Sequence, residues 1–286
     1  ALVEKAVKAF KQSRRLKAAE AKLEQARRHQ MFVASQIQRT LLLGRPPKDI
    51  PEITVGHHTI ASQHVDGDFY DFIRHGPSVV DIVVADIMGK GIMAAFMGAA
   101  LKSAFLRGIN ELSSSEPGMG PPAPHRIVKA VYENMITQME ELETFVTLCY
   151  ARFDLERYQL TFVDCGHVRP IHFRRSQNSV HLLRGVNMPL GFPEPGPFEQ
   201  FTVPFASGDL FLFYSDGVTE ASDSSGHLYG EHRLVAHVRN NEHLGPEALI
   251  RSIYDDVVAF TGTELFTDDF TCVCARIHSA KAPKRA

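Results

Sequence analysis

Two consecutive prolines, Pro46 and Pro47, divide this 286-residue sequence into two parts of different character. Residues 2–43 contain neither glycine nor proline and are rich in charged and amide side chains, which favours one long helix. Proline has no backbone N–H with which to continue a helix, so this helix must end before residue 46. We therefore predict a helical segment over residues 1–44, a globular domain over residues 45–280 and a disordered tail over residues 281–286.

Apolar and small side chains recur in a heptad pattern along the predicted helix. One core position holds Leu16, Leu23, Gln30 and Ile37, and the other holds Ala19, Ala26, Val33 and Thr40. This pattern favours a short, imperfect coiled coil, through which the chain would form a homodimer. The alternative is an amphipathic helix that packs on its own domain.

Short apolar runs begin at Ile53, and their order along the chain limits the possible folds. Strands are expected at 53–62, 69–75 and 79–87, then two helices at 91–109 and 125–142 joined by a mobile loop at 113–124. Further strands are expected at 144–154, 158–164, 168–175, 179–184, 200–204 and 209–215, followed by helices at 231–240 and 246–261 and a last strand at 270–278. The helix at 91–109 is apolar nearly all round, so we expect it to face the core. Because strands and helices do not alternate strictly, the order predicts an α+β sandwich of antiparallel sheets.

Composition excludes several classes of function. The chain is 44% hydrophobic and 22% charged, with a formal net charge of −2, so no basic surface for nucleic acid is predicted. No apolar run reaches the length of a membrane span, and we expect no membrane contact in this segment. The four cysteines form no CxxC pair and read as small buried hydrophobes, which fits a reducing cytoplasm. The chain could equally be the cytoplasmic part of a longer, membrane-anchored sensor.

Acidic residues are crowded in the stretch HVDGDFYDF, residues 64–72. Like charges at close range repel one another, and burial raises their pKa values, unless a cation lies among them. Asp68 lies in this stretch, Asp86 and Asp216 each follow an apolar strand and precede a glycine-containing turn, and the pair Asp268–Asp269 precedes the last strand. One strand-end aspartate is usually a turn former. Several of them on rigid strands provide the oxygen ligands that Mg²⁺ and Mn²⁺ prefer.

The sequence resembles the PPM (type 2C) metal-dependent serine/threonine protein phosphatases, in the bacterial branch typified by SpoIIE and RsbU. The stretches that carry the resemblance occur in the family's order over nearly the whole chain: VDGDFYDF, VADIMGKGIMAAFM, TFVTLCYARFD, VDCGHVRP, GDLFLFYSDGVTEA and TDDFTCVCARI. The resemblance implies a PPM-type α-β-β-α sandwich, in which two antiparallel sheets are flanked by helices and preceded by the long amino-terminal helix.

The same resemblance implies a centre of two Mg²⁺ or Mn²⁺ ions, or three. Asp68, Asp86 and the backbone carbonyl of Ile87 match one side of this centre, and Asp216 and Asp268 match the other. Asp269 is the alternative to Asp268, although the first aspartate of the pair fits the family pattern better. Catalysis would run through the bound metals and a bridging water.

The sequence departs from the family pattern in three places: at Asp66, in the turn with Met88 and Lys90, and where DCGH at residues 164–167 replaces NAGH. Asp66 stands where glycine is usual, as an additional carboxylate near the site or as an exposed one. Met88 and Lys90 occupy the turn in which eukaryotic relatives carry a histidine thought to act as general acid, so that role is unassigned. His167, in DCGH, is interpreted as structural, because turns between strands need such a hydrogen-bonding side chain.

The implied substrate is a phosphoprotein, in this branch typically a STAS-type anti-sigma-factor antagonist phosphorylated on serine or threonine, within bacterial partner-switching signalling. Two alternatives remain at this stage. One is a catalytically weak pseudophosphatase that acts as a scaffold, which usually lacks an acidic ligand. The other is a metal-dependent phosphoesterase that acts on a small molecule.

Overall fold

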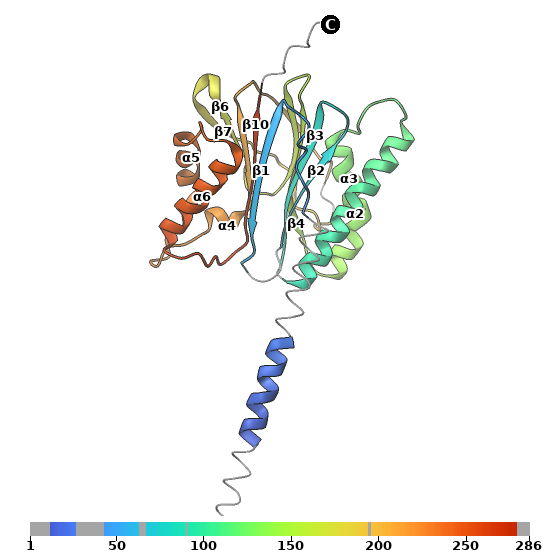
Figure 1. The fold of residues 1–286 in the computed structure, drawn as a ribbon. Coiled ribbons are helices and arrows are strands. Elements are labelled where there is room, and N and C mark those ends of the chain that lie inside the picture. The colour runs from blue at the N-terminus through green and yellow to red at the C-terminus, as the bar shows by residue number, and fades with distance from the viewer. Residues whose placement is uncertain (1–11, 27–42, 63–66, 90, 194–195, 279–286) are drawn as a thin grey trace, which may run out of the picture.

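The structure is a computed structural model of the chain, and it describes residues 12–26, 43–62, 67–89, 91–193 and 196–278. Ten strands form two five-stranded antiparallel sheets that face each other, with helices covering the two outer faces (Figure 1). The predicted α-β-β-α sandwich is therefore confirmed. Within the described residues, no helix is both long enough and apolar enough to cross a membrane.

The first sheet has the strand order β1-β10-β9-β6-β7. Its strands are β1 (Ile53–Ile60), β10 (Phe270–Ile277), β9 (Leu210–Tyr214), β6 (Ile171–Arg174) and β7 (Ser179–Leu182). Helices α5 (Gly230–Asn240) and α6 (Pro246–Thr261) cover its outer face. Strand β10 is buried along its whole length because α6 lies on one side of it and the second sheet on the other.

The second sheet has the strand order β2-β3-β4-β5-β8. Its strands are β2 (Asp68–Arg74), β3 (Val79–Ile87), β4 (Val146–Asp154), β5 (Gln159–Cys165) and β8 (Phe201–Pro204). Helices α2 (Ile92–Ser115) and α3 (Pro124–Glu141) cover its outer face (Figure 1). Three layers of buried apolar side chains result, one between the sheets and one beneath each helix pair.

Helix α2 differs from the prediction in two respects. It continues to Ser115, so the connection to α3 is shorter than the loop expected at 113–124. It also buries only one face, since the side chains of Met93, Phe96 and Leu106 are 59%, 69% and 47% exposed. Apolar sequence on all sides therefore did not indicate burial on all sides. Two short elements were also missed, a 3₁₀ turn at Arg175–Gln177 and helix α4 at Asp216–Thr219.

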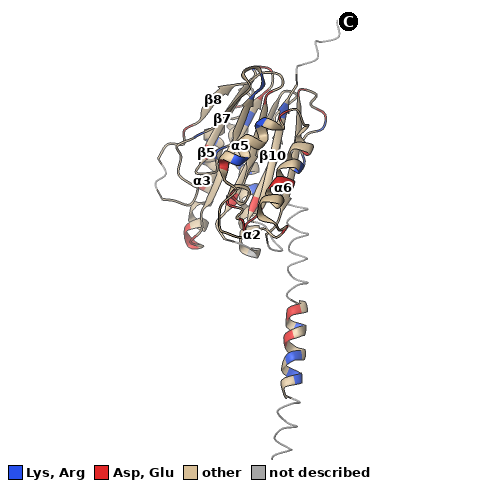
Figure 2. Ribbon diagram, turned by 90° about the vertical axis from the view of Figure 1, so that its left-hand side faces the viewer, with Lys and Arg blue, Asp and Glu red and all other residues tan. Residues whose placement is uncertain are grey.

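The amino-terminal segment is helical over residues 12–26, and every residue of that helix is exposed in the single chain. Figure 2 shows acidic residues in the part of this helix nearer the domain and basic residues mainly in the part farther from it. Leu16 and Leu23, two of the predicted seam residues, are 57% and 71% exposed. The seam from Gln30 to Thr40 and the predicted tail at 281–286 lie outside the described residues, so the coiled coil and the disordered tail stay predictions.

Candidate active site

Asp68 and Asp86 lie side by side, although 18 positions separate them in the sequence. Asp68 begins β2, Asp86 lies near the end of β3, and the antiparallel register places the two residues directly opposite each other. Asp68 is only 4% exposed, whereas Asp86 is half-buried. Opposed residues on neighbouring strands have their Cβ atoms about 5 Å apart, so the two carboxylates share one local environment.

Gly67 packs closely against the turn that follows Asp86. The Ile87 N–H donates to the carbonyl of Gly67 over 3.2 Å. A Cβ atom on Gly67 would lie 3.1 Å from the carbonyl oxygens of both Ile87 and Gly89, and 3.5 Å from Oδ1 of Asp86. The Ile87 carbonyl, a predicted ligand, therefore packs against the backbone of Gly67. A side chain at position 67 would crowd this carbonyl.

Asp216 and the Asp268–Asp269 pair come from the other sheet, at the end of β9 and the start of β10. Ser215 joins these two turns: its hydroxyl donates to the Asp269 carbonyl over 2.9 Å and accepts the Thr271 N–H over 3.0 Å. The approach is so close that a Cβ atom on Gly217 would lie 2.2 Å from the Asp269 carbonyl oxygen. The turn that carries Asp216 is thus packed directly on the turn that carries the aspartate pair.

Asp68 is influenced by residues of both sheets. Burial raises the pKa of its carboxyl well above the usual range, and the neighbouring charge of Asp86 raises it further. Hydrogen bonding by Thr271 and Ser215, both from the opposite sheet, acts in the other direction. Among the described residues, Oδ2 of Asp68 is buried and has no hydrogen-bond partner. A buried carboxylate oxygen without a partner, beside a second carboxylate, is stabilised by a cation.

The chemistry of the donors fits a hard divalent cation, because each predicted ligand offers an oxygen atom. In the part of the chain that the structure describes, no three His, Cys, Asp or Glu side chains converge closely enough to hold one ion. The predicted ligands lie on adjoining turns, but among the described residues they do not form a closed ligand cluster. A cation would have to draw their side chains together.

The two aspartates that precede β10 differ in their surroundings. Asp269 is 4% exposed, and its carboxylate accepts hydrogen bonds from Ser62 and from the Gly67 N–H. Asp268 is half-buried, and its Oδ1 accepts the N–H of Asp269 over 2.9 Å. The family pattern favours Asp268 as the ligand, and these contacts show that the two aspartates have different surroundings.

His167 occupies a supporting position behind the site. Its N–H donates to Oδ1 of Asp164 over 2.9 Å, and its Nδ1 lies 3.0 Å from the hydroxyl of Thr147, the residue opposite Asp86 on β4. Burial lowers the pKa of the imidazole to about 4, so it is neutral at neutral pH. These contacts agree with the structural interpretation of His167. Asp66 and Lys90 lie outside the described residues.

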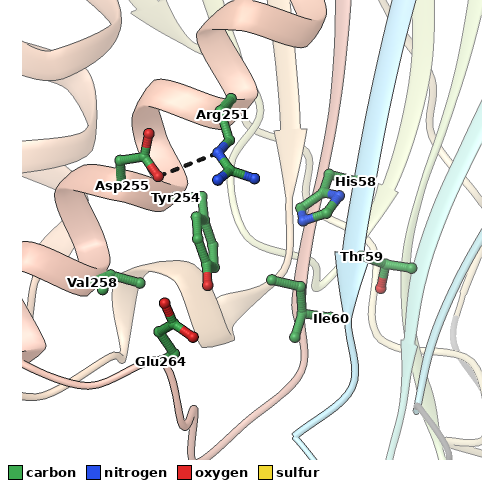
Figure 3. A pocket seen from close by; sticks show the side chains of 8 residues that line it. All are labelled: His58, Thr59, Ile60, Arg251, Tyr254, Asp255, Val258 and Glu264. Carbon is green, nitrogen blue, oxygen red and sulfur yellow. Dashed lines mark ion pairs between the residues drawn. The ribbon is translucent and has the colours of Figure 1, made fainter.

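A separate pocket lies between β1 and α6 (Figure 3). The Tyr254 ring stands inside it, and Arg251 pairs with Asp255 across 3.3 Å at its rim. The pocket is lined by none of the predicted metal ligands. It touches the site only indirectly, because the hydroxyl of its lining residue Thr59 lies 2.8 Å from that of Thr271.

Comparison with known proteins identifies the family. The sequence model of the family described as "Stage II sporulation protein E (SpoIIE)" matches residues 76–278, which is more than half of the chain. The chain belongs to the SpoIIE family. The phosphoserine phosphatase RsbU of Bacillus subtilis (strain 168) is 26% identical to this SpoIIE-family chain over 256 residues, which are 89% of the chain and 72% of RsbU. Two other curated relatives are longer, and the chain spans less than half of each.

Solved structures show the same fold as this SpoIIE-family protein. The SiaA-PP2C domain of Pseudomonas aeruginosa superposes with a TM-score of 0.73 at 21% identity, over 91% of this chain and 99% of that domain. The catalytic domain of the serine/threonine phosphatase PstP of Mycobacterium tuberculosis, solved with two manganese ions, gives a TM-score of 0.55 at 14% identity, over 79% and 99% of the two chains. The recognised family and the predicted enzyme class, a protein serine/threonine phosphatase of the PPM type, are thereby confirmed.

Proposed function

We propose that this phosphatase depends on two or three divalent cations, Mg²⁺ or Mn²⁺. Asp68, Asp86 and the Ile87 carbonyl would hold them from one sheet, and Asp216 with one aspartate of the 268–269 pair would hold them from the other. The observation that carries the proposal is Asp68, whose buried, unpartnered oxygen lies beside Asp86 at the junction of the two sheets. PstP, which shares the fold, binds two manganese ions.

The residues of this chain would bind and orient. A divalent cation pair supplies Lewis-acid activation of water and neutralises charge on the phosphoryl group. Asp68 and Asp86 are fixed on paired strands, so their carboxylates are positioned before substrate binds. Burial and the charge of Asp86 raise the pKa of Asp68, so protonation competes with cation binding at this carboxylate, and cation binding should strengthen as pH rises.

The proposed substrate is a protein phosphorylated on serine or threonine, of the STAS-type anti-sigma-factor antagonist class, in partner-switching signalling. The match to RsbU, a phosphoserine phosphatase, supports this class. We propose action as a homodimer through residues 1–44, without nucleic acid or membrane contact by this segment. The four buried, unpaired cysteines agree with a reducing cytoplasm as its location.

Phosphate release from a purified phospho-STAS protein tests the proposal, measured with Mg²⁺, Mn²⁺ or EDTA. Asp216→Ala and Asp86→Ala should each lower turnover by about 100-fold or more while the protein stays folded. Asp255→Ala is the matched control, because Asp255 is 60% exposed on α6. Wild-type metal stoichiometry in Asp216→Ala, measured by calorimetry, would contradict the ligand assignment.

The same assay separates the alternatives. A scaffold without catalysis would release no phosphate with any cation, although every aspartate of the predicted set is present. A small-molecule phosphoesterase would hydrolyse an aryl phosphate but leave the phosphoprotein intact. Hydrolysis of both substrates, with loss of both in EDTA, is the result expected of a metal-dependent protein phosphatase.

A further inference from the structure

The carboxylate of Asp269 has both of its oxygens engaged by protein donors. Oδ1 accepts the N–H of Ser62 over 2.7 Å and its hydroxyl over 2.8 Å, and Oδ2 accepts the N–H of Gly67 over 2.6 Å. Asp269 itself is 4% exposed. Ser62 and Gly67 are the described residues on either side of positions 63–66, so one carboxylate fastens both ends of the β1–β2 connection to the start of β10.

One of the residues held by Asp269, Gly67, is next to the predicted ligands. Gly67 precedes Asp68 in the chain, and its carbonyl accepts the N–H of Ile87. A Cβ atom added to Gly67 would lie 3.1 Å from the Ile87 carbonyl oxygen and 3.5 Å from Oδ1 of Asp86, so this glycine packs closely against both residues. Gly67 therefore contacts Asp269 of the first sheet on one side and the turn after Asp86 of the second sheet on the other.

A cation bound by Asp269 would compete with these contacts. Oδ1 already accepts two hydrogen bonds from Ser62, and Oδ2 accepts a short one from the Gly67 N–H, so three of the about four lone pairs of the carboxylate are engaged by the protein. Asp268 is half-buried, and its Oδ1 accepts the Asp269 N–H. We infer that Asp269 is a positioning residue that clamps the β1–β2 connection and so places Asp68, Asp86 and the Ile87 carbonyl. The ligand of the pair is then Asp268, as the family resemblance implies. The inference rests on the proposed metal-dependent function.

Thermal unfolding in EDTA tests the clamp without any metal. Asp269→Asn should lower the melting temperature by about 4 °C or more, because an amide N–H₂ in place of Oδ2 faces the Gly67 N–H and cannot accept from it. Asp268→Asn is the matched control: its amide oxygen can still accept the Asp269 N–H, and it removes one charge from a crowded acidic site. Its melting temperature should fall by less than that of Asp269→Asn, or rise. Equal, unchanged melting temperatures for the two variants would overturn the inference.

Calorimetric titration with Mn²⁺ tests the assignment of the ligand. Asp269→Asn should keep the wild-type number of ions with about 10- to 100-fold weaker affinity, and Asp268→Asn should bind one ion fewer. Ser62→Ala removes only the hydroxyl bond, so it should reproduce the Asp269→Asn effects at smaller size. It serves in the same tests if Asp269→Asn does not fold. Loss of an ion in Asp269→Asn would overturn the inference, whereas a wild-type protein that binds no Mn²⁺ would overturn the proposed function and leave the unfolding test of the clamp standing.

Discussion

Gly217 lies where the turn carrying Asp216 meets the turn carrying Asp268 and Asp269. A Cβ atom at this position would lie 2.2 Å from the carbonyl oxygen of Asp269 and 2.9 Å from its carbonyl carbon. Both atoms belong to the backbone, so rotation of a side chain cannot relieve the contact. Ordinary van der Waals contact begins near 3.4 Å. In Gly217→Ala the two turns must therefore separate by about 1 Å.

That separation acts on both activity and stability. A misplacement of about 1 Å in a catalytic arrangement costs about 100-fold in rate, or about 2.7 kcal/mol of transition-state free energy. Overpacking of a buried position typically costs about 1–3 kcal/mol of unfolding free energy, which leaves most domains folded. We expect Gly217→Ala to remain folded, with phosphate release slowed by about 100-fold and weaker Mn²⁺ binding.

The assay is the initial rate of phosphate release at saturating Mn²⁺, with circular dichroism as the check on folding. Gly245→Ala is the control: its φ is −65°, and a Cβ atom there would meet nothing within 4 Å. A folded Gly217→Ala enzyme with a rate within threefold of wild type would refute the claim that the spacing of these turns sets the geometry of the site.

Three further predictions concern stability, its pH dependence and assembly. Arg152→Met should cost about 3–5 kcal/mol of unfolding free energy, because it leaves the fully buried Asp81 without its guanidinium partner. Arg157→Met, which removes the exposed partner of Asp154, is the control and should change the unfolding free energy by less than about 0.5 kcal/mol. Equal effects of the two substitutions would contradict the prediction. Burial raises the pKa of Asp81, but Arg152 and His75 outweigh it and hold the pKa below its usual range, so this stabilisation should be present above about pH 4 and be lost as pH falls through the lowered value. Removal of residues 1–45 should convert a dimer to a monomer in light scattering, and an unchanged mass would contradict the coiled-coil prediction.

The order of the elements could be predicted from local sequence. Residues 43–50, on either side of Pro46 and Pro47, contain no helix, and the buried run at 79–87 is a strand in the structure at the predicted bounds. Asp86 and Asp216 could be singled out because each stands where an apolar strand gives way to a glycine turn. Period, propensity and turn chemistry act over a few residues, so they can be recognised without knowledge of the rest of the fold.

Tertiary structure decided how those residues are used. Helix α2 exposes Met93 and Phe96 because only one side of it meets the sheet, a fact that its uniformly apolar sequence concealed. Asp268 and Asp269 are adjacent and chemically identical, and Asp269 is set apart by hydrogen bonds from residues about 200 positions earlier in the chain. Ser62 and Gly67 bind Asp269 because β1 pairs with β10 and places the β1–β2 connection over the start of β10. Hydrogen bonds between such distant residues depend on strand pairing and register, which the residues around Asp269 do not encode.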